Sequence, residues 1–456
     1  MSVSECRYRN ASGFPGRLSM AQLEPGKMVL FQNTIMLYIL IFSSYFFNFI
    51  TIPYQTRILG PEYFGRLGFA MALMAYFRLF IDFGFILSAT EEIARNRHDK
   101  HELSKIVISV NLVKILLGFA GLAAISLICA LFPRFGADFK LYLLCFLSVI
   151  SAAFLPDFLY RGLEKMKTIT IIAVLIQLFF VSMIFVFMKS AQDYLMVPLF
   201  TTIGNLIAMA GVYYHAFKSV GIRLVRVEPA YILQTFKRSR YFFYSRIAST
   251  IYSATNTFLI GIFNPAGSRI VGLYSSADKL VNTARKGFSP VADSLYPYMV
   301  KNRDFRLALK ILALMVPPVI FVCILIGVNA EPFCEFLLGS QFRDAGHILR
   351  LLMPVIAISS AVYILGFPIL TPMGLARYGN FSTIAASIFH VSILLFLIFT
   401  KRFTVENVCY LTCASELLVL LFRIHVIWKN RHLISWIRAN AEQSDDCVRF
   451  TNDRIN

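Results

Sequence analysis

Long apolar segments alternate with short polar ones along almost the whole chain. Each apolar segment reaches the roughly 20 helical residues that cross a hydrocarbon core of about 30 Å. None shows the strict alternation over about ten residues that a membrane β-barrel requires, and in a bilayer the backbone of a helix satisfies its own polar groups. The pattern therefore predicts an all-α integral membrane protein with about twelve transmembrane helices, which cover approximately residues 28–50, 63–88, 105–131, 139–159, 168–188, 194–217, 241–263, 270–298, 307–328, 348–370, 380–400 and 405–428.

Composition supports this interpretation. The 456 residues are 57% hydrophobic and 15% charged, whereas a soluble protein carries about 25% charged residues. The mean hydropathy is +0.66. High hydrophobicity together with few charged residues is typical of a polytopic membrane protein.

The net charge of +19 is distributed unevenly along the chain. With the N-terminus in the cytoplasm, the tails and inner loops hold about 26 Lys and Arg residues and the outer loops about 8, as the positive-inside rule requires. This surplus indicates orientation and contact with anionic lipids. It does not indicate nucleic acid, because no basic stretch is interleaved with aromatic residues in a soluble module. We expect both termini to be cytoplasmic.

The two halves of the chain show a weak internal repeat. A shift of 207 residues lays 63–78 on 270–285, and it matches Tyr45 with Tyr252, Gly65 with Gly272, Ala70 with Ala277, Leu73 with Leu280, and Arg78 with Arg285. We expect two pseudo-symmetric six-helix lobes around a central cavity. The predicted segments are a polar, disordered cytoplasmic tail (1–27), an N-terminal lobe (28–217), a basic cytoplasmic linker (218–240), a C-terminal lobe (241–428) and a cytoplasmic tail (429–456).

The predicted helix 270–298 is the most charged of the twelve. At mid-membrane each charge costs about 2.5–3.5 kcal/mol, while a Leu, Ile or Val returns only about 0.3–0.6 kcal/mol. Spacings of seven residues place the charges on one side of the helix, which must face a wet or protein-lined cavity. Pro290 and Pro297 predict a kink near its cytoplasmic end. The charged residues are Asp278, Lys279, Arg285, Lys286 and Asp293.

Arg78 is the repeat counterpart of Arg285, with Asp82 one helical turn further on. Charged residues inside a membrane usually have a function. Here the cations outnumber the carboxylates, so we expect the cavity to bind an anion. The candidate substrate-binding residues are Arg78, Lys114, Arg246, Lys279, Arg285 and Lys286.

Structural interpretations of several charges stay open. Ion pairs that only neutralise each other remain an alternative for Arg78 with Asp82, Asp157 with Arg161, and Glu416 or Arg423 with their neighbours, and Arg246 could snorkel to the headgroups. For His390 a satisfied interior imidazole is favoured over a proton relay.

One stretch carries a family resemblance. The segment "TIPYQTRILGPEYFGRLGFAMALMAYFRLFIDFGFILSATEEIARNR" (51–97) resembles the N-terminal signature of Wzx-type flippases, the polysaccharide-transport branch of the multidrug/oligosaccharidyl-lipid/polysaccharide exporter superfamily. The segments "FLPDFLYRGLEKMK" (154–167) and "VGLYSSADKLVN" (271–282) are similar to further family segments.

The resemblance implies a protein of the bacterial inner membrane that moves an undecaprenyl-pyrophosphate-linked oligosaccharide to the periplasmic leaflet, for O-antigen or a related surface polysaccharide. Polysaccharide polymerase and chain-length regulator proteins are the protein partners that it implies. Alternating access between the lobes is the expected mechanism. Because no GxxxxGK[ST] phosphate loop is present, we expect no nucleotide cofactor and an ion gradient as the energy source, with Asp82, Asp278 and Asp293 as candidates for ion coupling.

Two other functions compete with this one. A cation-coupled multidrug exporter of the same superfamily would favour surplus carboxylates in its cavity. A membrane-embedded glycan polymerase or glycosyltransferase would display a sizeable outer loop with catalytic residues, whereas the longest outer loop predicted here is about 329–347. We therefore expect a transporter and no enzyme, and no Cys or His spacing predicts a bound metal.

Overall fold

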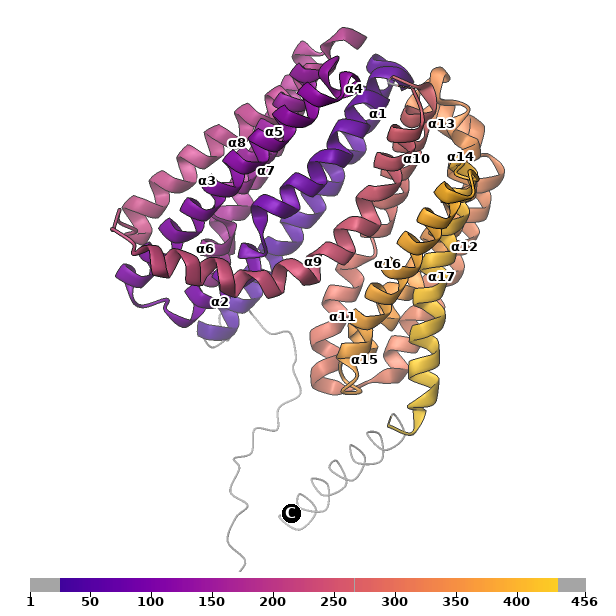
Figure 1. Ribbon diagram of the computed structural model, residues 1–456. Coiled ribbons are helices and arrows are strands. Elements are labelled where there is room, and N and C mark those ends of the chain that lie inside the picture. Colours follow the sequence, from indigo (N-terminus) through magenta and orange to yellow (C-terminus); the bar gives the residue numbers. More distant parts are fainter. Residues whose placement is uncertain (1–24, 266, 434–456) are drawn as a thin grey trace, which may run out of the picture.

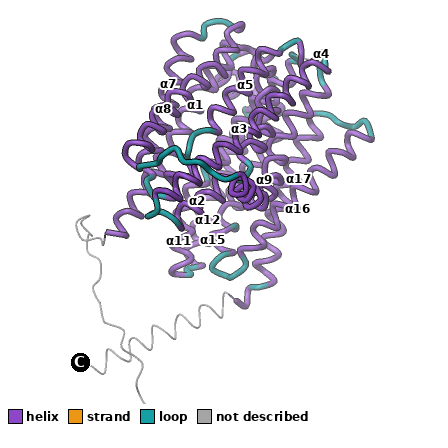
Figure 2. Tube along the Cα trace, turned by 60° about the vertical axis from the view of Figure 1, so that its left-hand side comes forward, coloured by secondary structure: helices purple, strands orange, loops and turns teal. Residues whose placement is uncertain are grey.

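The computed structural model describes residues 25–265 and 267–433, and every regular element in them is a helix (Figure 1, Figure 2). The first half contains α1 (Pro25–Asp82), α2 (Phe85–Arg95), α3 (Lys100–Leu131), α4 (Pro133–Gly136), α5 (Phe139–Ala153), α6 (Asp157–Gly162), α7 (Met166–Phe187), η2 (Ala191–Leu195), α8 (Met196–His215), η3 (Ala216–Val220) and α9 (Pro229–Phe263). The second half contains α10 (Arg269–Lys286), α11 (Ser289–Asn302), α12 (Phe305–Val328), α13 (Ala330–Leu338), η4 (Ser340–Phe342), α14 (Ala345–Leu365), α15 (Phe367–Leu370), α16 (Ala376–Phe399) and α17 (Val405–Lys429). The all-α prediction is confirmed, and the two predicted tails fall almost wholly outside the described residues.

Nine helices of the described residues are long and apolar enough to cross a membrane. The first of them is Tyr38–Arg95, which includes most of α1 and all of α2 and counts once. Yet α1 alone holds parts of two predicted spans, which meet at Gly60 in a left-handed conformation (φ 63°). The predicted spans on α9 and α10 are not among the nine. Helix α10 carries too many charged residues, and the described apolar part of α9 is Ala254–Phe263. The multi-pass membrane fold is confirmed, and the number of twelve spans stays a prediction.

The helices form two bundles that meet at one end and diverge at the other (Figure 1). We call α1–α8 the N-lobe and α10–α17 the C-lobe. Helices α1 and α10 pack along the interface between them. At the closed end, which holds α4 and α13, the guanidinium of Arg57 in the N-lobe donates to the carbonyl of Phe336 in the C-lobe at 2.5 Å. The predicted arrangement in two lobes is thus present.

Helix α9 links the lobes: it begins at the open end and its last turn reaches α4 at the closed end, where Arg134 donates to the carbonyl of Ile262 at 2.8 Å. It packs against α1, α2 and α3 of the N-lobe and against α16 of the C-lobe. Arg238 forms an ion pair with Glu92 of α2 at 2.7 Å, and the Tyr231 hydroxyl donates to Glu92 at 3.3 Å. Burial, with Glu92 and Glu102 beside it, raises the pKa of Tyr231. The second half of the predicted linker 218–240 is therefore helical and attached to the N-lobe.

Two predicted spans end earlier than expected. The span 63–88 stops at Asp82, because Phe83 (φ 37°) and Gly84 (φ 79°) leave the helical region. The Phe83 ring stacks on those of Phe236 and Phe243 of α9, with centroids 4.3 and 4.5 Å away. The pattern of apolar positions in a helix does not predict a contact between segments so far apart in the sequence.

The span 270–298 is broken rather than kinked. The expectation of a continuous helix bent at its prolines was wrong, since α10 ends at Lys286 and α11 begins at Ser289. Pro290 lies in the first turn of α11, where its missing N–H has no partner to lose and its fixed φ suits a new helix. The break places Asp293 on a helix separate from Arg285.

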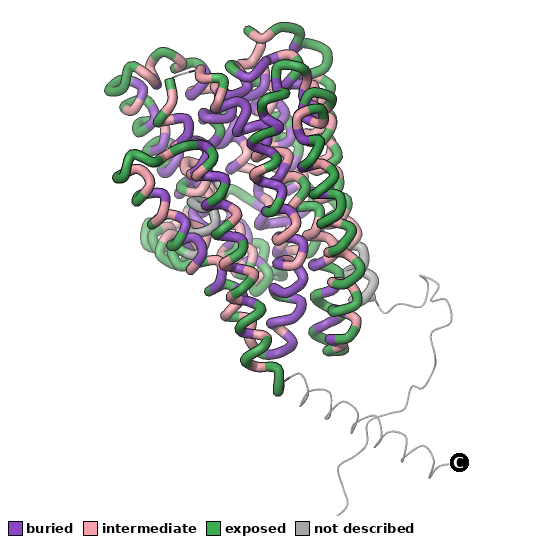
Figure 3. Tube along the Cα trace, turned by 90° about the vertical axis from the view of Figure 1, so that its right-hand side faces the viewer, coloured by how far each residue is buried: buried purple, intermediate pink, exposed green. Residues whose placement is uncertain are grey.

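The outward faces of the C-lobe are exposed and apolar. Figure 3 shows exposed positions along the outside of the bundle and buried ones inside it. Leu314 and Phe321 of α12 and Phe399 of α16 are 77%, 67% and 82% exposed. A surface of this kind is unstable in water but suits hydrocarbon, so it marks the lipid-facing side.

Candidate functional site

Each lobe encloses a cavity that contains predicted charges. The N-lobe cavity has a volume of about 360 Å³, and its polar lining residues are Arg78, Asp82, Lys114, Asp157, Gln177, Thr201 and Asn205. The C-lobe cavity has a volume of about 590 Å³, and its polar lining residues are Arg285, Asp293, Tyr296, Tyr363, Thr383, Glu416 and Arg423. In the described residues five of the nine predicted site residues therefore line two separate cavities, where we had expected convergence on one.

In the N-lobe cavity Arg78 and Asp82 form a loose ion pair. The Nε and Oδ2 atoms are 3.6 Å apart, and the two side chains are 61% and 21% exposed. An exposed pair at this distance is worth little energy. Arg78 is thus available to an incoming anion at small cost.

Lys114 is the buried cation of the N-lobe cavity. Its side chain donates to the carbonyl oxygen of Ala153 at 2.5 Å and lies 5.4 Å from the ring centroid of Phe158. Ala153 ends α5, and the partial negative charge of a helix C-terminus stabilises a cation. The acceptor of the Lys114 hydrogen bond is thus a backbone carbonyl and not a carboxylate.

Asp157 pairs along its own helix with Arg161. The carboxylate and guanidinium are 3.0 Å apart and about one-third exposed. This geometry fits the structural interpretation of that pair.

In the C-lobe cavity Arg285 of α10 pairs with Glu416 of α17. The two side chains are 19% and 5% exposed, so this ion pair is buried, unlike the one in the N-lobe. The hydroxyl of Ser359 on α14 donates to the second carboxylate oxygen at 3.5 Å. Three helices thus meet at one carboxylate.

Arg423, one cation of the C-lobe cavity, is 8% exposed. It donates to the carbonyl of Val362 at 2.5 Å, to Ser382 Oγ at 3.1 Å and to the carbonyl of Gly379 at 3.4 Å. Like Lys114, it is held by backbone oxygen. Each cavity therefore combines a carboxylate-paired arginine with a cation that carbonyl groups hold.

Formal charges of the cavity linings balance. Each lining contains two basic and two acidic residues, so the predicted excess of cations is absent from the linings themselves. In the described part of the chain, Lys114 and Arg423 are the cations of these neutral linings whose hydrogen-bond acceptors are carbonyl or hydroxyl oxygens and not carboxylates. From the sequence, Glu416 and Arg423 are expected only to pair with their neighbours. Their position inside a predicted membrane span is the feature that could have marked them as site residues.

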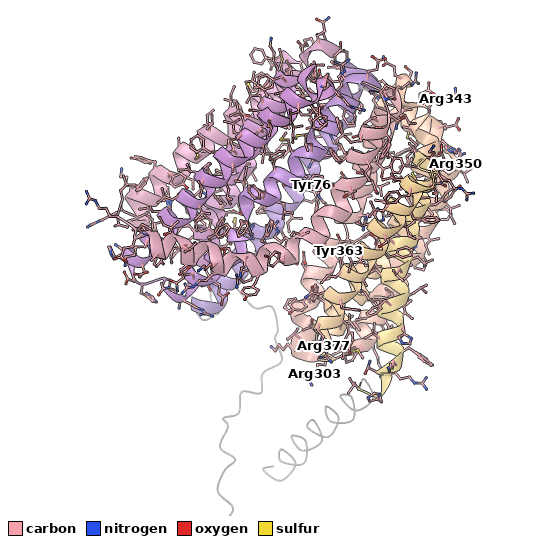
Figure 4. The ribbon with its side chains drawn as sticks, in the orientation of Figure 1. Tyr76, Arg303, Arg343, Arg350, Tyr363 and Arg377 are labelled. Atoms are coloured by element: carbon pink, nitrogen blue, oxygen red, sulfur yellow. The ribbon has the colours of Figure 1, made fainter. Side chains whose placement is uncertain are left out.

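Asp293 lies on the exposed side of the C-lobe cavity. Ser289 donates to its carboxylate at 2.7 Å. Tyr363, another lining residue, sits about halfway along the C-lobe in Figure 4, and Tyr76 sits about halfway along the N-lobe. The C-lobe cavity thus extends to mid-depth of the bundle.

The remaining candidates lie outside these two linings. Lys279 is half-buried at the lobe interface, 4.5 Å from the ring centroid of Phe64 on α1. Asp278 is also half-buried, and Lys286 is exposed at the end of α10. Arg246 is half-buried on α9. The structure does not bring these four side chains into either cavity.

His390 belongs to a buried polar network in the C-lobe. Its Nδ1 lies 2.9 Å from Ser415 Oγ and its Nε2 2.9 Å from Asn256 Oδ1. Both ring nitrogens therefore have partners, which agrees with the favoured interpretation of a satisfied imidazole. Asn256, which also donates to Thr412 at 3.0 Å, was not singled out from sequence.

Both ends of the bundle carry arginines, and those at the open end include exposed ones. Arg303 and Arg377 lie at the open end in Figure 4, and Arg343 and Arg350 at the closed end. Arg343 lies 3.7 Å from Glu331 and 3.9 Å from Glu335.

Solved structures show the same fold. The chain is similar to an inward-facing multidrug resistance MATE family transporter of the MOP superfamily, with a TM-score of 0.67, 14% identity and coverage of 87% of this chain and 95% of the other. It is also similar to the lipid II flippase MurJ in an inward closed conformation, with a TM-score of 0.64, 13% identity and coverage of 89% and 90%. At these identities the likeness concerns the fold alone.

Sequence comparisons point to polysaccharide export. A Shigella dysenteriae protein named "Putative O-antigen transporter" is 27% identical over 364 residues, which cover 79% of this chain and 91% of that protein. An Escherichia coli K12 protein of the same name is 25% identical over 425 residues, which cover 90% and 100%. The profile of the polysaccharide biosynthesis protein family matches residues 30–303. This chain belongs to the polysaccharide biosynthesis protein family.

Proposed function

We propose that the protein is a flippase for undecaprenyl-pyrophosphate-linked oligosaccharides, which it moves from the cytoplasmic to the periplasmic leaflet of the bacterial inner membrane for O-antigen or a related polysaccharide. The observation that carries the proposal is the repeated cation arrangement: Arg78 with Lys114 in one lobe and Arg285 with Arg423 in the other. The names of the two O-antigen transporter relatives support the substrate class.

The chemistry of the substrate matches these cavities. A diphosphate with a sugar headgroup cannot cross about 30 Å of hydrocarbon unaided. Guanidinium groups bind phosphate through two parallel hydrogen bonds, which makes arginine suited to this task. The lipid tail stays in the bilayer, along the apolar outer faces, while the headgroup passes between the lobes.

The divergence of the lobes supports alternating access. They are closed at the α4 and α13 end and apart at the other (Figure 1). We assign the open end to the cytoplasm, where the positive-inside rule puts Lys and Arg, so this conformation receives substrate from the cytoplasmic leaflet. Both termini then lie in the cytoplasm.

An ion gradient is the energy source in this proposal. Asp82 and Asp293 line the two cavities, and Asp278 lies half-buried on α10, so all three stay candidates for ion coupling. Arg246, Lys279 and Lys286 stay candidates for later steps in which the lobes have moved. A polysaccharide polymerase and a chain-length regulator are the protein partners that fit the product.

Surface display in cells tests the proposal. We expect that a strain without this protein lacks the surface polysaccharide and accumulates lipid-linked repeat units on the cytoplasmic side, and that the wild-type gene restores display. Restored display with Arg78→Ala and with Arg285→Ala would remove both residues from the site. Chain extension of glycan by the purified protein would instead favour an enzyme, and export of cationic drugs would favour a multidrug transporter.

A further inference from the structure

Glu416 occupies an unusual position for a carboxylate in a membrane bundle. Its side chain is 5% exposed and is held by Arg285 of α10 and by Ser359 of α14. A buried charge is tolerated only with a partner, and an arginine left alone at this depth would be costly. Arg285 and Glu416 therefore compensate each other's charge in this structure.

Open space lies directly beside this pair. Arg285 and Glu416 both line the C-lobe cavity of about 590 Å³, which falls within the range of about 300–1,000 Å³ for ligand sites. A phosphate that enters the cavity can reach Arg285 in place of the carboxylate. Since one anion then replaces another at Arg285, the arginine remains neutralised, and the cost of the exchange falls on the buried carboxylate of Glu416, which has lost its cation partner.

Arg423 provides a second cation that does not exchange. Its acceptors are the carbonyls of Val362 and Gly379 and the hydroxyl of Ser382. A Cβ atom on Gly366 would lie 2.6 Å from Arg423 Nη1, so this glycine leaves room for the guanidinium. An entering phosphate thus finds one fixed guanidinium and one that must be released from Glu416.

We propose that Glu416 is an internal ligand of Arg285, which the phosphate of the substrate displaces on binding and which expels that phosphate when it returns. This inference rests on the proposed function and deepens it, because it assigns a positioning residue for substrate release. Without a competing carboxylate, a diphosphate between two guanidinium groups would bind too tightly to be released quickly.

The N-lobe lacks an equally strong competitor. Arg78 and Asp82 are 3.6 Å apart, and Arg78 is 61% exposed, so this pair adds little energy and resists a phosphate weakly. The exchange at Arg285 is therefore the step at which tight binding of the phosphate is balanced against its release.

The experiment uses the full-length protein in nanodiscs and farnesyl diphosphate as a short isoprenoid diphosphate probe. Glu416→Gln is expected to lower the Kd of the probe about tenfold, which corresponds to about 1.4 kcal/mol, and to slow substrate translocation. Glu416→Asp, which keeps the charge on a shorter side chain, is expected to give an intermediate Kd. This second variant keeps the test valid if the amide variant does not fold.

Glu406→Gln is the matched control, because Glu406 is exposed in the first turn of the same helix. Its Kd should equal that of the wild type. Arg285→Ala should weaken binding of the probe and abolish the gain from Glu416→Gln in the double variant.

Two results distinguish a failure of the internal-ligand proposal from a failure of the flippase proposal. If Arg285→Ala weakens binding but Glu416→Gln and Glu416→Asp bind as the wild type does, the internal ligand is refuted and the flippase proposal survives. If Arg285→Ala binds the probe as tightly as the wild type, the C-lobe cavity is not a phosphate site and both claims fail there.

Discussion

Gly65 of α1 and Gly272 of α10 face each other across the lobe interface. A Cβ atom on Gly65 would lie 2.7 Å from the backbone nitrogen of Gly272, and one on Gly272 would overlap the carbonyl group of Pro61. The two glycines are also the pair that the 207-residue shift matches. Gly60 and Gly267, related by the same shift, are both left-handed, with φ of 63° and 72°. Residues that the repeat relates to each other therefore meet at the contact of α1 with α10.

Gly272→Leu should separate the lobes at this contact. Backbone atoms cannot move aside as a flexible side chain does, so overpacking here should cost about 1–3 kcal/mol. We expect a protein that inserts into the membrane but loses stability and most of its transport, measured by thermal unfolding in detergent and by surface polysaccharide display.

Gly211→Leu is the control for that variant. Gly211 lies on α8, and nothing stands within 4 Å of an added Cβ. Transport should stay at the wild-type level. Equal behaviour of the two leucine variants would contradict the close-approach interpretation.

Substitutions of Arg78 test whether transport needs only its positive charge or also the planar shape of its guanidinium group. Arg78→Lys should keep part of the transport if charge alone matters and very little if two parallel hydrogen bonds to phosphate are needed. Exchanging Arg78 and Asp82 keeps the loose pair but moves the cation. We expect the exchanged protein to fold and to lose transport, whereas full transport would show that the pair is structural.

Gly366→Ala should weaken substrate binding because it moves Arg423, and not because it disturbs the backbone around position 366. The added methyl group would meet the guanidinium at 2.6 Å, so the guanidinium must shift and its hydrogen bonds to the carbonyl acceptors should weaken. We expect farnesyl diphosphate binding to weaken several-fold while the fold persists. Gly211→Ala, measured in parallel, should leave the affinity unchanged, and a Gly366→Ala variant with normal affinity would place Arg423 outside the site.

Asp99 offers a pH-dependent test outside the membrane. Backbone hydrogen bonds from Glu102 and His101 lower the pKa of this N-cap carboxyl below its ordinary value of 3.8. A lowered folded-state pKa means that the stabilising contribution is present above pH 3.8 and is lost as the pH falls through the folded-state value. Amide exchange in the first turn of α3 should be faster in Asp99→Ala than in the wild type at pH 7. The difference should vanish in acid, and a difference that persists there would contradict the carboxylate cap.

The sequence predicted the parts of the fold that depend on local pattern. Apolar runs of membrane length gave the helices, and the charges on α10 showed that it could not face lipid. The breaks were different, because the turn at Phe83 depends on stacking against Phe236 and Phe243, more than 150 residues away.

The site was less accessible to sequence reasoning for the same reason. Arg285 and Glu416 are 131 positions apart, and no spacing rule joins residues at that separation. Arg423 is held largely by backbone carbonyls, which exist at every position and leave no mark in the sequence. Two cavities in place of one follow from packing within each lobe, which a pattern of charges does not specify.

The central claim is that cations from both lobes carry a diphosphate across the membrane. Its most direct test is translocation of a fluorescent undecaprenyl-diphosphate oligosaccharide in proteoliposomes with an imposed ion gradient, followed by quenching of the dye in the outer leaflet. We predict rapid translocation by the wild type and the protein-free rate for the double variant Arg78→Ala, Arg285→Ala. A double variant that translocates the lipid at the wild-type rate would contradict the account.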